Sequence, residues 1–228
     1  IARSATLYVF RTLIDRDIPL NSGCLRPIEI IIPEGSLLSP RHPAAVSSGN
    51  PETSVLVTDA LYGALDIIGG SQGTMNNFTF GNATYQYYET ICGGAGAGNG
   101  FNGASAVHTH MTNSLMTDPE VFELRFPVLL EEFSVRSGSG GGGRWKGGEG
   151  TKRRVRFLQD LDMAIVANRR VIAPAGARGG EAGEVGAHRV IRKDGTITEL
   201  KSCDMTSVRP GDVFEILTPG GGGFGQNA

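Results

Sequence analysis

Two histidines, His108 and His110, stand one residue apart after the glycine-rich run "GGAGAGNGFNGASAV". On a strand, this spacing would place both imidazoles on one face, close enough to share a metal ion. The third ligand that such a site needs could be Glu89, Asp118 or His42. A proton-transfer or substrate-binding role is a second possibility, because imidazole titrates near neutral pH. The third possibility is structural, with both rings bonded to loop carbonyls.

Four primary amides lie in a short stretch just before these histidines: Gln72, Asn76, Asn77 and Asn82. A primary amide both donates and accepts hydrogen bonds, so such a group could grip a neutral amide or imide ring. Asn side chains also close turns, and this second interpretation stays open for the same stretch.

Glycine makes up 34 of the 228 residues and occurs in clusters, which indicates loops that need positive φ or close backbone approach. Residues 98–103 match the pattern GxGxxG, but "ASAVHTH" after them is a poor helix start, so a dinucleotide fold is not predicted. The sequence contains no GxxxxGK[ST] phosphate loop.

Composition excludes several classes of protein. A net charge of −2 gives no long-range attraction to nucleic acid. No apolar stretch approaches the roughly 20 residues of a membrane span. The three dispersed cysteines fit a reducing compartment and predict a cytoplasmic protein. The start lacks both Met and a signal-peptide pattern, which indicates a chain cut from a longer one.

The first part of the chain predicts two or three helices and a few strands. Residues 2–16 carry apolar side chains at helical spacing, and the β-branched "PIEIIIP" at 27–33 predicts a strand. A second helix should begin with Asn50 as cap and Pro51 in its first turn, and stop at Gly69-Gly70. Its expected core face is a wide apolar stripe: Val55, Leu56, Ala60, Leu61, Ala64, Leu65 and Ile68. Asp118, or a capping box of Thr117 and Glu120, should start a third helix.

Beyond Pro127, glycine-rich turns separate six expected short strands: "VLLEEFSVR", "KRRVRFL", "MAIVAN", "HRVIRK", "TITEL" and "VFEIL". The sequence therefore predicts an α+β fold, predominantly β, with a mixed lobe at 1–127 and a β-rich lobe at 128–228. Lys152, Arg154 and Arg156 should line the outer face of one strand, with Val155 and Phe157 pointing inward. Aromatic anchors are expected for two glycine turns, at Trp145 and Phe224. Arg169 and Arg170 should form a solvated or ion-paired surface, with anion binding as the alternative.

Eight stretches in order resemble the C-terminal part of B-type members of the hydantoinase B/oxoprolinase family. They are "LNSGCLRPIEIIIPEGSLLSP", "AAVSSGN", "GSQGTMNNFTFGN", "YYETICGGAGAG", "SAVHTHMTNSLMTDPEVFELRFPV", "GSGGGGRWKGGEG", "RPGD" and "TPGGGGFG". The family includes ATP-dependent 5-oxoprolinases, N-methylhydantoinase B subunits, and acetone and acetophenone carboxylases. The likeness covers nearly the whole chain and is greatest to 5-oxoprolinases and hydantoinases.

The resemblance implies part of an oligomeric enzyme that opens a lactam or hydantoin ring. An A-type subunit or domain would bind ATP and Mg and phosphorylate the ring carbonyl. The absent N-terminal half of the B-type chain, which holds a divalent metal in related carboxylases, is a second implied partner. This chain alone should be inactive. The alternatives are part of a carboxylase, or a non-catalytic module for assembly.

The resemblance also supplies candidate site residues. His108, His110 and Glu89 are the candidate catalytic residues. The candidate substrate-binding residues are Asn76, Asn77, Gly94 and Gly96. We expect the histidines and the two asparagines to form one wall of a shared cavity.

Overall fold

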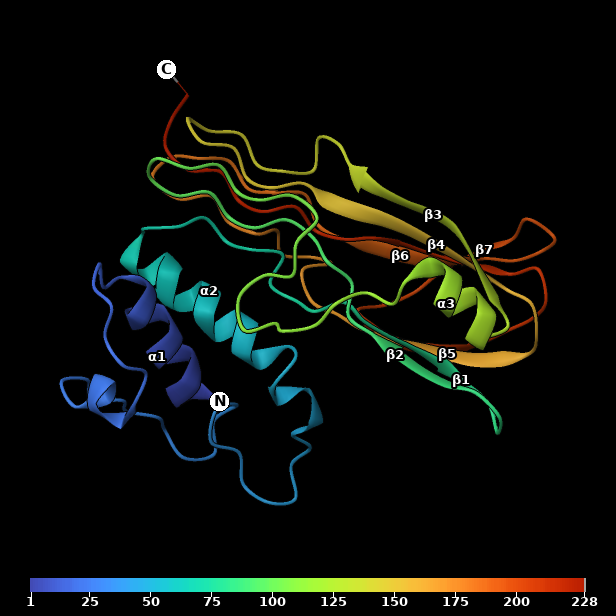
Figure 1. Ribbon diagram of the computed structural model, residues 1–228, viewed down its shortest axis with the longest axis horizontal. Coiled ribbons are helices and arrows are strands. Elements are labelled where there is room, and N and C mark those ends of the chain that lie inside the picture. The colour runs from blue at the N-terminus through green and yellow to red at the C-terminus, as the bar shows by residue number, and fades with distance from the viewer. Residues whose placement is uncertain (228) are drawn as a thin grey trace.

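The structure is a computed structural model that describes residues 1–227. Its largest unit is a sandwich of two antiparallel sheets with strand orders β2-β1-β5-β8 and β3-β4-β9-β6-β7 (Figure 1). The predicted α+β, mostly β fold is therefore confirmed. The strands are β1 (Asn77–Gly81), β2 (Gln86–Glu89), β3 (Val128–Arg136), β4 (Gly150–Phe157), β5 (Leu161–Val166), β6 (Ala187–Ile191), β7 (Ile197–Glu199), β8 (Cys203–Val208) and β9 (Val213–Leu217).

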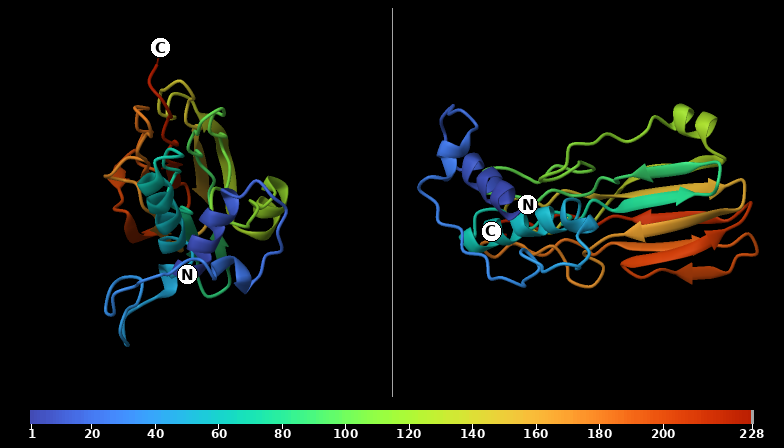
Figure 2. Two further views of the ribbon diagram at one scale, coloured as in Figure 1. Left: turned by 90° about the vertical axis from the view of Figure 1, so that its left-hand side faces the viewer. Right: turned by 90° about the horizontal axis from the view of Figure 1, so that it is seen from below.

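Extended glycine-rich segments lead away from the sheets and pack together at the other end of the molecule (Figure 2). We call residues 69–73, 93–104, 138–149, 174–184 and 218–225 the glycine bundle. Successive amides of the central segment, 218–225, donate in different directions, and two of the neighbouring segments are met again three residues later. These bonds are Gly221 and Phe224 to the carbonyls of Gly148 and Trp145, and Gly220 and Gly223 to those of Glu184 and Glu181. A threefold repeat of this kind is typical of polyproline-II-like chains.

Glycine is required in the bundle because backbone packs on backbone. A Cβ at Gly96 would lie 1.7 Å from the Gly69 carbonyl oxygen, and one at Gly221 would lie 1.9 Å from that of Ala95. The prediction of close backbone approach is confirmed. The side chains of Trp145 and Phe224 pack on each other at the end of the bundle, with ring centroids 5.7 Å apart, as expected for anchors.

Two helices lie along the glycine bundle, and a third lies beside the sandwich (Figure 1). They are α1 (Ala2–Thr12), α2 (Thr53–Leu65) and α3 (Pro119–Arg125). The Asp118 carboxylate caps α3 by accepting from the amides of Glu120 and Val121, as predicted. No helix among the described residues is long and apolar enough to cross a bilayer.

The first two helices differ from their predictions at the ends. Helix α1 stops at Thr12 rather than residue 16, because Leu13 and Ile14 beyond it remain exposed and gain little from helical packing. Helix α2 begins after Glu52, and the Asn50 side chain does not cap it. The backbone carbonyl of Asn50 instead accepts a hydrogen bond from the Ser54 hydroxyl. Asp66, in the left-handed conformation at φ 53°, ends α2 before the glycines.

Most of the predicted apolar stripe of α2 is not its buried face, because Val55 is the one member of the stripe that is buried. The buried residues are Ser54, Val55, Thr58, Asp59 and Tyr62, while Ala60, Ala64 and Leu65 are exposed. The physical reason is that α2 packs against backbone that needs polar partners. Asp59 accepts from the Ser71 amide of the bundle, for example.

The predicted strand at 27–33 is also wrong. The segment has no regular secondary structure and lies outside both sheets, and Ile31 is 81% exposed. Alternating apolar residues form a strand only where a neighbour offers a free edge, and the described chain places none there. Conversely, β8 was not predicted, because its "CDMTSV" sequence is mainly polar.

One core joins both predicted lobes. Phe78 of β1 pairs with Ile165 of β5, and Phe122 of α3 belongs to the same buried cluster as Phe157 of β4. Residue 127 therefore does not separate two packed units in this structure. The predicted faces of β4 are confirmed, since Val155 and Phe157 are fully buried and Lys152, Arg154 and Arg156 form ion pairs at the outer face.

Candidate functional site

A groove of about 570 Å³ runs between α1 and the glycine bundle. Both histidines of the "HTH" sequence line it. The complete lining is Tyr8, Ala95, Val107, His108, Thr109, His110, Met111, Thr112 and Asn113. The groove is open at the surface, so a small molecule or another part of a larger protein can reach it.

The histidine segment is irregular rather than a strand, so the predicted strand spacing does not apply. A pair of backbone hydrogen bonds between Val107 and Gly93 ties its start to the bundle. Ala106 and Met111 on either side have φ values of 53° and 62°, a region that costs energy for residues with a side chain. The surrounding packing holds this strained segment so that both imidazoles line the groove.

Three consecutive residues offer buried polar atoms that have no partner in the described structure. They are His108 Nδ1, Thr109 Oγ1 and His110 Nε2. Among the described residues, neither imidazole bonds to a loop carbonyl, so the structural role considered for the pair lacks its expected contacts there. Buried polar atoms are normally paired, and three without partners beside one groove indicate a binding position for water or a ligand.

His110 is held from its other nitrogen. The Tyr8 hydroxyl lies 3.0 Å from His110 Nδ1, and the ring of Tyr62 packs 5.1 Å from the imidazole centroid. Burial lowers the pKa of His110, although the Asp59 carboxylate acts in the opposite direction. Burial also lowers the pKa of His108. Both rings are therefore neutral near pH 7 and able to accept a proton.

Asp59 of α2 is the buried charge nearest to this network. Its carboxylate accepts from the Ser71 amide at 3.1 Å and pairs with Arg169 Nη2 at 3.2 Å. Burial raises the pKa of Asp59, and these partners oppose the rise. Arg169 and Arg170 thus do not form a surface pair: Arg169 is largely buried against Asp59, and Arg170 bonds to His188 and Asn76.

Asn76 and Asn77 lie away from the groove, and the expected shared wall is not formed. Asn76 donates to Gln72 Oε1 at 2.8 Å and to the Ile91 carbonyl at 3.0 Å, and accepts from Arg170. Asn77 donates to Glu52 at 2.6 Å and to the Val166 carbonyl at 2.8 Å, and accepts from Tyr88. Both amides are fully engaged in buried contacts between α2, the strands and the bundle.

Glu89 lies in a separate buried cluster. Its carboxylate accepts from the Tyr87 hydroxyl and pairs with Arg153 Nη2 at 3.0 Å. The Arg153 side chain is 1% exposed and the Glu89 side chain 2%. Arg153 was not singled out from the sequence, yet the alternation of β4 contained the signal. If Lys152, Arg154 and Arg156 face outward, Arg153 between them must face the core.

Gly94 and Gly96 flank Ala95, which lines the groove. A Cβ at Gly94 would lie 2.1 Å from the Gly148 carbonyl oxygen, so both glycines face neighbouring backbone. The two glycines therefore support the groove wall on the side that faces the glycine bundle.

The residues present do not fit a metal centre or a nucleotide site. Within residues 1–227, no group of three His, Cys, Asp or Glu side chains is suitably placed for a metal ion. The candidate third ligands are dispersed: Asp118 caps α3, Glu89 pairs with Arg153 and His42 is exposed. In the described part of the chain, neighbouring backbone fills the space beside most glycines of the bundle, among them Gly94, Gly96 and Gly103, so these offer no cradle for phosphates.

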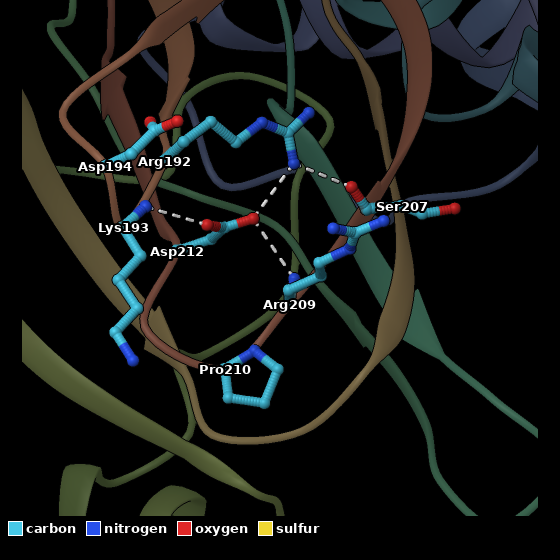
Figure 3. A pocket seen from close by; sticks show the side chains of 7 residues that line it. All are labelled: Arg192, Lys193, Asp194, Ser207, Arg209, Pro210 and Asp212. Carbon is cyan, nitrogen blue, oxygen red and sulfur yellow. Dashed lines mark hydrogen bonds and ion pairs between the residues drawn. The ribbon is translucent and has the colours of Figure 1, made fainter.

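A second hollow of about 510 Å³ lies beside the turns of the sandwich (Figure 3). Its central carboxylate, Asp212, accepts from Arg192 Nη1 at 2.9 Å and from the amides of Lys193 and Arg209 at 3.0 and 3.1 Å. These bonds close the two turns on each other. The charged residues around this hollow therefore have a structural role, and we do not take the hollow as the candidate site.

Comparisons with known proteins give a consistent result. The sequence pattern of the family described as Hydantoinase B/oxoprolinase matches residues 1–227. The chain is 50% identical to 5-oxoprolinase 1 of Arabidopsis thaliana over all of its own length, which is 18% of that protein. It therefore spans less than a fifth of this relative.

Two solved structures share the fold. An ATP-dependent caprolactamase from Pseudomonas jessenii superposes with a TM-score of 0.81 at 25% identity, covering 99% of this chain and 43% of that one. A nucleotide-free acetone carboxylase gives a TM-score of 0.57 at 18% identity, covering 69% of this chain and 26% of that one. The second likeness shows the fold alone.

Proposed function

Because the chain belongs to the hydantoinase B/oxoprolinase family, we propose that it is part of an ATP-dependent enzyme that hydrolyses a small cyclic amide. The observation that carries this proposal is the groove in which His108, Thr109 and His110 present unpartnered buried polar atoms. The 5-oxoprolinase relative and the caprolactamase both act, by their names, on a lactam or its equivalent.

The groove supplies proton transfer in this proposal. A neutral His110 takes a proton at Nε2 from the water that attacks the ring carbonyl carbon. As the C–N bond breaks, its electron pair passes to the ring nitrogen, and the imidazolium returns the proton to that nitrogen. His108, on the same groove, would hydrogen-bond the substrate, and the buried Thr109 hydroxyl would hold the water.

An unstrained amide is a poor electrophile, so ring opening needs activation, which we assign to transfer of the γ-phosphoryl group of ATP to the ring carbonyl oxygen. Breaking the C–N bond then leaves an acyl phosphate, which a second water hydrolyses to the carboxylate and inorganic phosphate. We place ATP, with Mg, on an A-type subunit or domain, because the glycine segments of this chain are filled by one another. The N-terminal half of the B-type chain is the second proposed partner, and the assembled enzyme is proposed to be oligomeric. The three free cysteines suit the reducing cytosol in which we place it.

The decisive experiment uses the full-length protein with its A-type partner. Turnover of 5-oxoproline and of hydantoin is measured together with ATP hydrolysis, for wild type, His108→Ala and His110→Ala. Each histidine variant should assemble normally and lose about 10²–10⁴-fold in kcat, the range for general acid–base groups. The control is His42→Ala, an exposed histidine outside the groove, which should retain wild-type turnover.

The rival functions give different results in the same assay. Normal turnover in both groove variants would leave only an assembly role for this region. A requirement for bicarbonate would favour the carboxylase alternative, whereas ring opening in its absence would count against it.

A further inference from the structure

The contact between α1 and His110 has a consequence for where the imidazole carries its proton. A neutral imidazole has one N–H and one lone pair. Nδ1 of His110 lies 3.0 Å from the Tyr8 oxygen, and Nε2 is buried without a partner. In one tautomer, Nε2 carries an N–H donor that has no acceptor. In the other tautomer, Nε2 has a lone pair that has no donor.

A buried N–H without an acceptor is rarer in proteins than an acceptor with unused capacity. The phenol of Tyr8 can accept as well as donate, so it is compatible with a proton on Nδ1. The favoured arrangement is thus an Nδ1–H that donates to the Tyr8 oxygen, with the lone pair on the buried Nε2 left unpaired.

We propose that Tyr8 is a positioning residue that fixes His110 in the Nδ1–H tautomer, so that Nε2 can act as the base for substrate water. The proposal rests on the proposed function for its catalytic consequence, but the tautomer itself is a property of the protein. The proton on Nδ1 stays in place during the reaction. Nε2 gains the water proton and later releases it to the departing nitrogen, so protons balance over one cycle.

The surroundings of His110 support this role for Tyr8 over the other nearby phenol. Tyr62 also packs against the imidazole, but its hydroxyl bonds to Thr12 Oγ1 at 2.6 Å instead of to the ring. The two tyrosines therefore contact the same imidazole with their rings, while only the Tyr8 hydroxyl contacts a ring nitrogen. This difference offers a matched pair of variants.

The test compares Tyr8→Phe with Tyr62→Phe in the full-length enzyme with its A-type partner. Each change keeps the aromatic ring and removes one hydroxyl. Tyr8→Phe should lower kcat by about 10–100-fold while KM changes by less than about threefold, because the base is mispositioned and substrate contacts remain. Tyr62→Phe should change kcat by less than about twofold.

A second readout does not depend on turnover. ¹⁵N-labelled histidine in the full-length protein distinguishes protonated from unprotonated ring nitrogens by NMR, and a His110→Gln sample identifies the His110 signals. We expect Nδ1–H in the wild type and a shift toward Nε2–H in Tyr8→Phe. A wild-type proton on Nε2, or an unchanged tautomer and kcat in Tyr8→Phe, would overturn the inference.

Failure of the proposed function looks different. If His110→Ala turns over normally while the NMR shows the Nδ1–H form, the tautomer assignment holds and the chemistry lies elsewhere. If His110→Ala loses turnover while Tyr8→Phe changes nothing, the function stands and the role of Tyr8 is refuted.

Discussion

Glu89 and Arg153 show what a single buried charge does in this protein. Glu89 ends β2 in one sheet and Arg153 lies in β4 of the other, so their contact at 3.0 Å joins the two sheets. Burial raises the pKa of Glu89, and Arg153 counteracts the rise. The predicted catalytic role of Glu89 remains a prediction, while its structural contact is clear.

Removing one member of this pair should therefore be costly. We expect Glu89→Leu to lower the free energy of unfolding by about 3–5 kcal/mol, because it leaves the buried guanidinium without its counter-charge. The double variant Glu89→Leu/Arg153→Met should recover most of the loss, as measured by denaturant unfolding. If the single and double variants were equally stable, the loss of stability would not come from a buried guanidinium without its counter-charge.

The buried His188 side chain should make the stability of the protein depend on pH. Burial and the neighbouring Arg170 lower the pKa of His188 from 6.5 to about 4. The unfolded chain therefore binds a proton in a range where the folded protein does not, and stability falls as the pH drops from about 6.5 to about 4. The loss from this group should be on the order of 3 kcal/mol.

The measurement is the free energy of unfolding at several pH values for wild type and His188→Gln. Glutamine keeps a neutral acceptor for Arg170 but does not titrate. The variant should show a shallower loss between pH 6.5 and 4. Parallel curves for the two proteins would remove His188 as the cause.

At the scale of elements, the glycine bundle is the unusual feature. Its segments lack side chains where they meet, so they gain stability from backbone hydrogen bonds and close packing rather than from a hydrophobic core. The histidine groove is built on this bundle through the bonds between Gly93 and Val107. The bundle therefore serves as the rigid support of the site.

Two glycine-to-alanine changes test this view. Gly96→Ala would place a Cβ 1.7 Å from the Gly69 oxygen, which is backbone and has little room to move. It should destabilise the protein by about 3 kcal/mol or more. Gly63→Ala on α2 has nothing within 4 Å of its Cβ and should stabilise the protein by about 0.5–1 kcal/mol. Thermal unfolding of both variants checks the contrast, which would vanish if the bundle were loosely packed.

At the scale of the whole molecule, sandwich and bundle are one continuous unit. Strand β4 begins at Gly150 directly after a bundle segment, and β9 ends at Leu217 directly before another. The sheet core also draws residues from both sides of residue 127. We therefore expect the two parts to unfold together.

The single tryptophan, Trp145, makes this prediction measurable, because it lies in the bundle. Its fluorescence should follow the bundle during denaturant unfolding, while far-UV circular dichroism follows mainly the sheets. The two transitions should coincide in midpoint and slope, as for a two-state domain. Separate midpoints would instead show that the bundle and the sandwich unfold independently.

Much of this protein follows from its sequence because local patterns specify backbone geometry. Short apolar and β-branched runs between glycine turns marked β3, β4 and β9, Asp118 before Pro119 marked the start of α3, and the clustered glycines marked close backbone approach. The pair His108 and His110 was recognised from residue type and spacing, and the structure places both on one groove.

The tertiary structure alone decided which partners these residues meet. Asn76 and Asn77 look like ligand-binding amides in the sequence, but their donors and acceptors are used by residues up to 94 positions away. Helix α2 buries a polar face because its neighbour is buried backbone that needs hydrogen-bond partners, and the strand expected at 27–33 finds no edge to join in the described structure. The periodicity of a segment depends on nearby residues, whereas hydrogen-bond satisfaction depends on which distant segment packs against it.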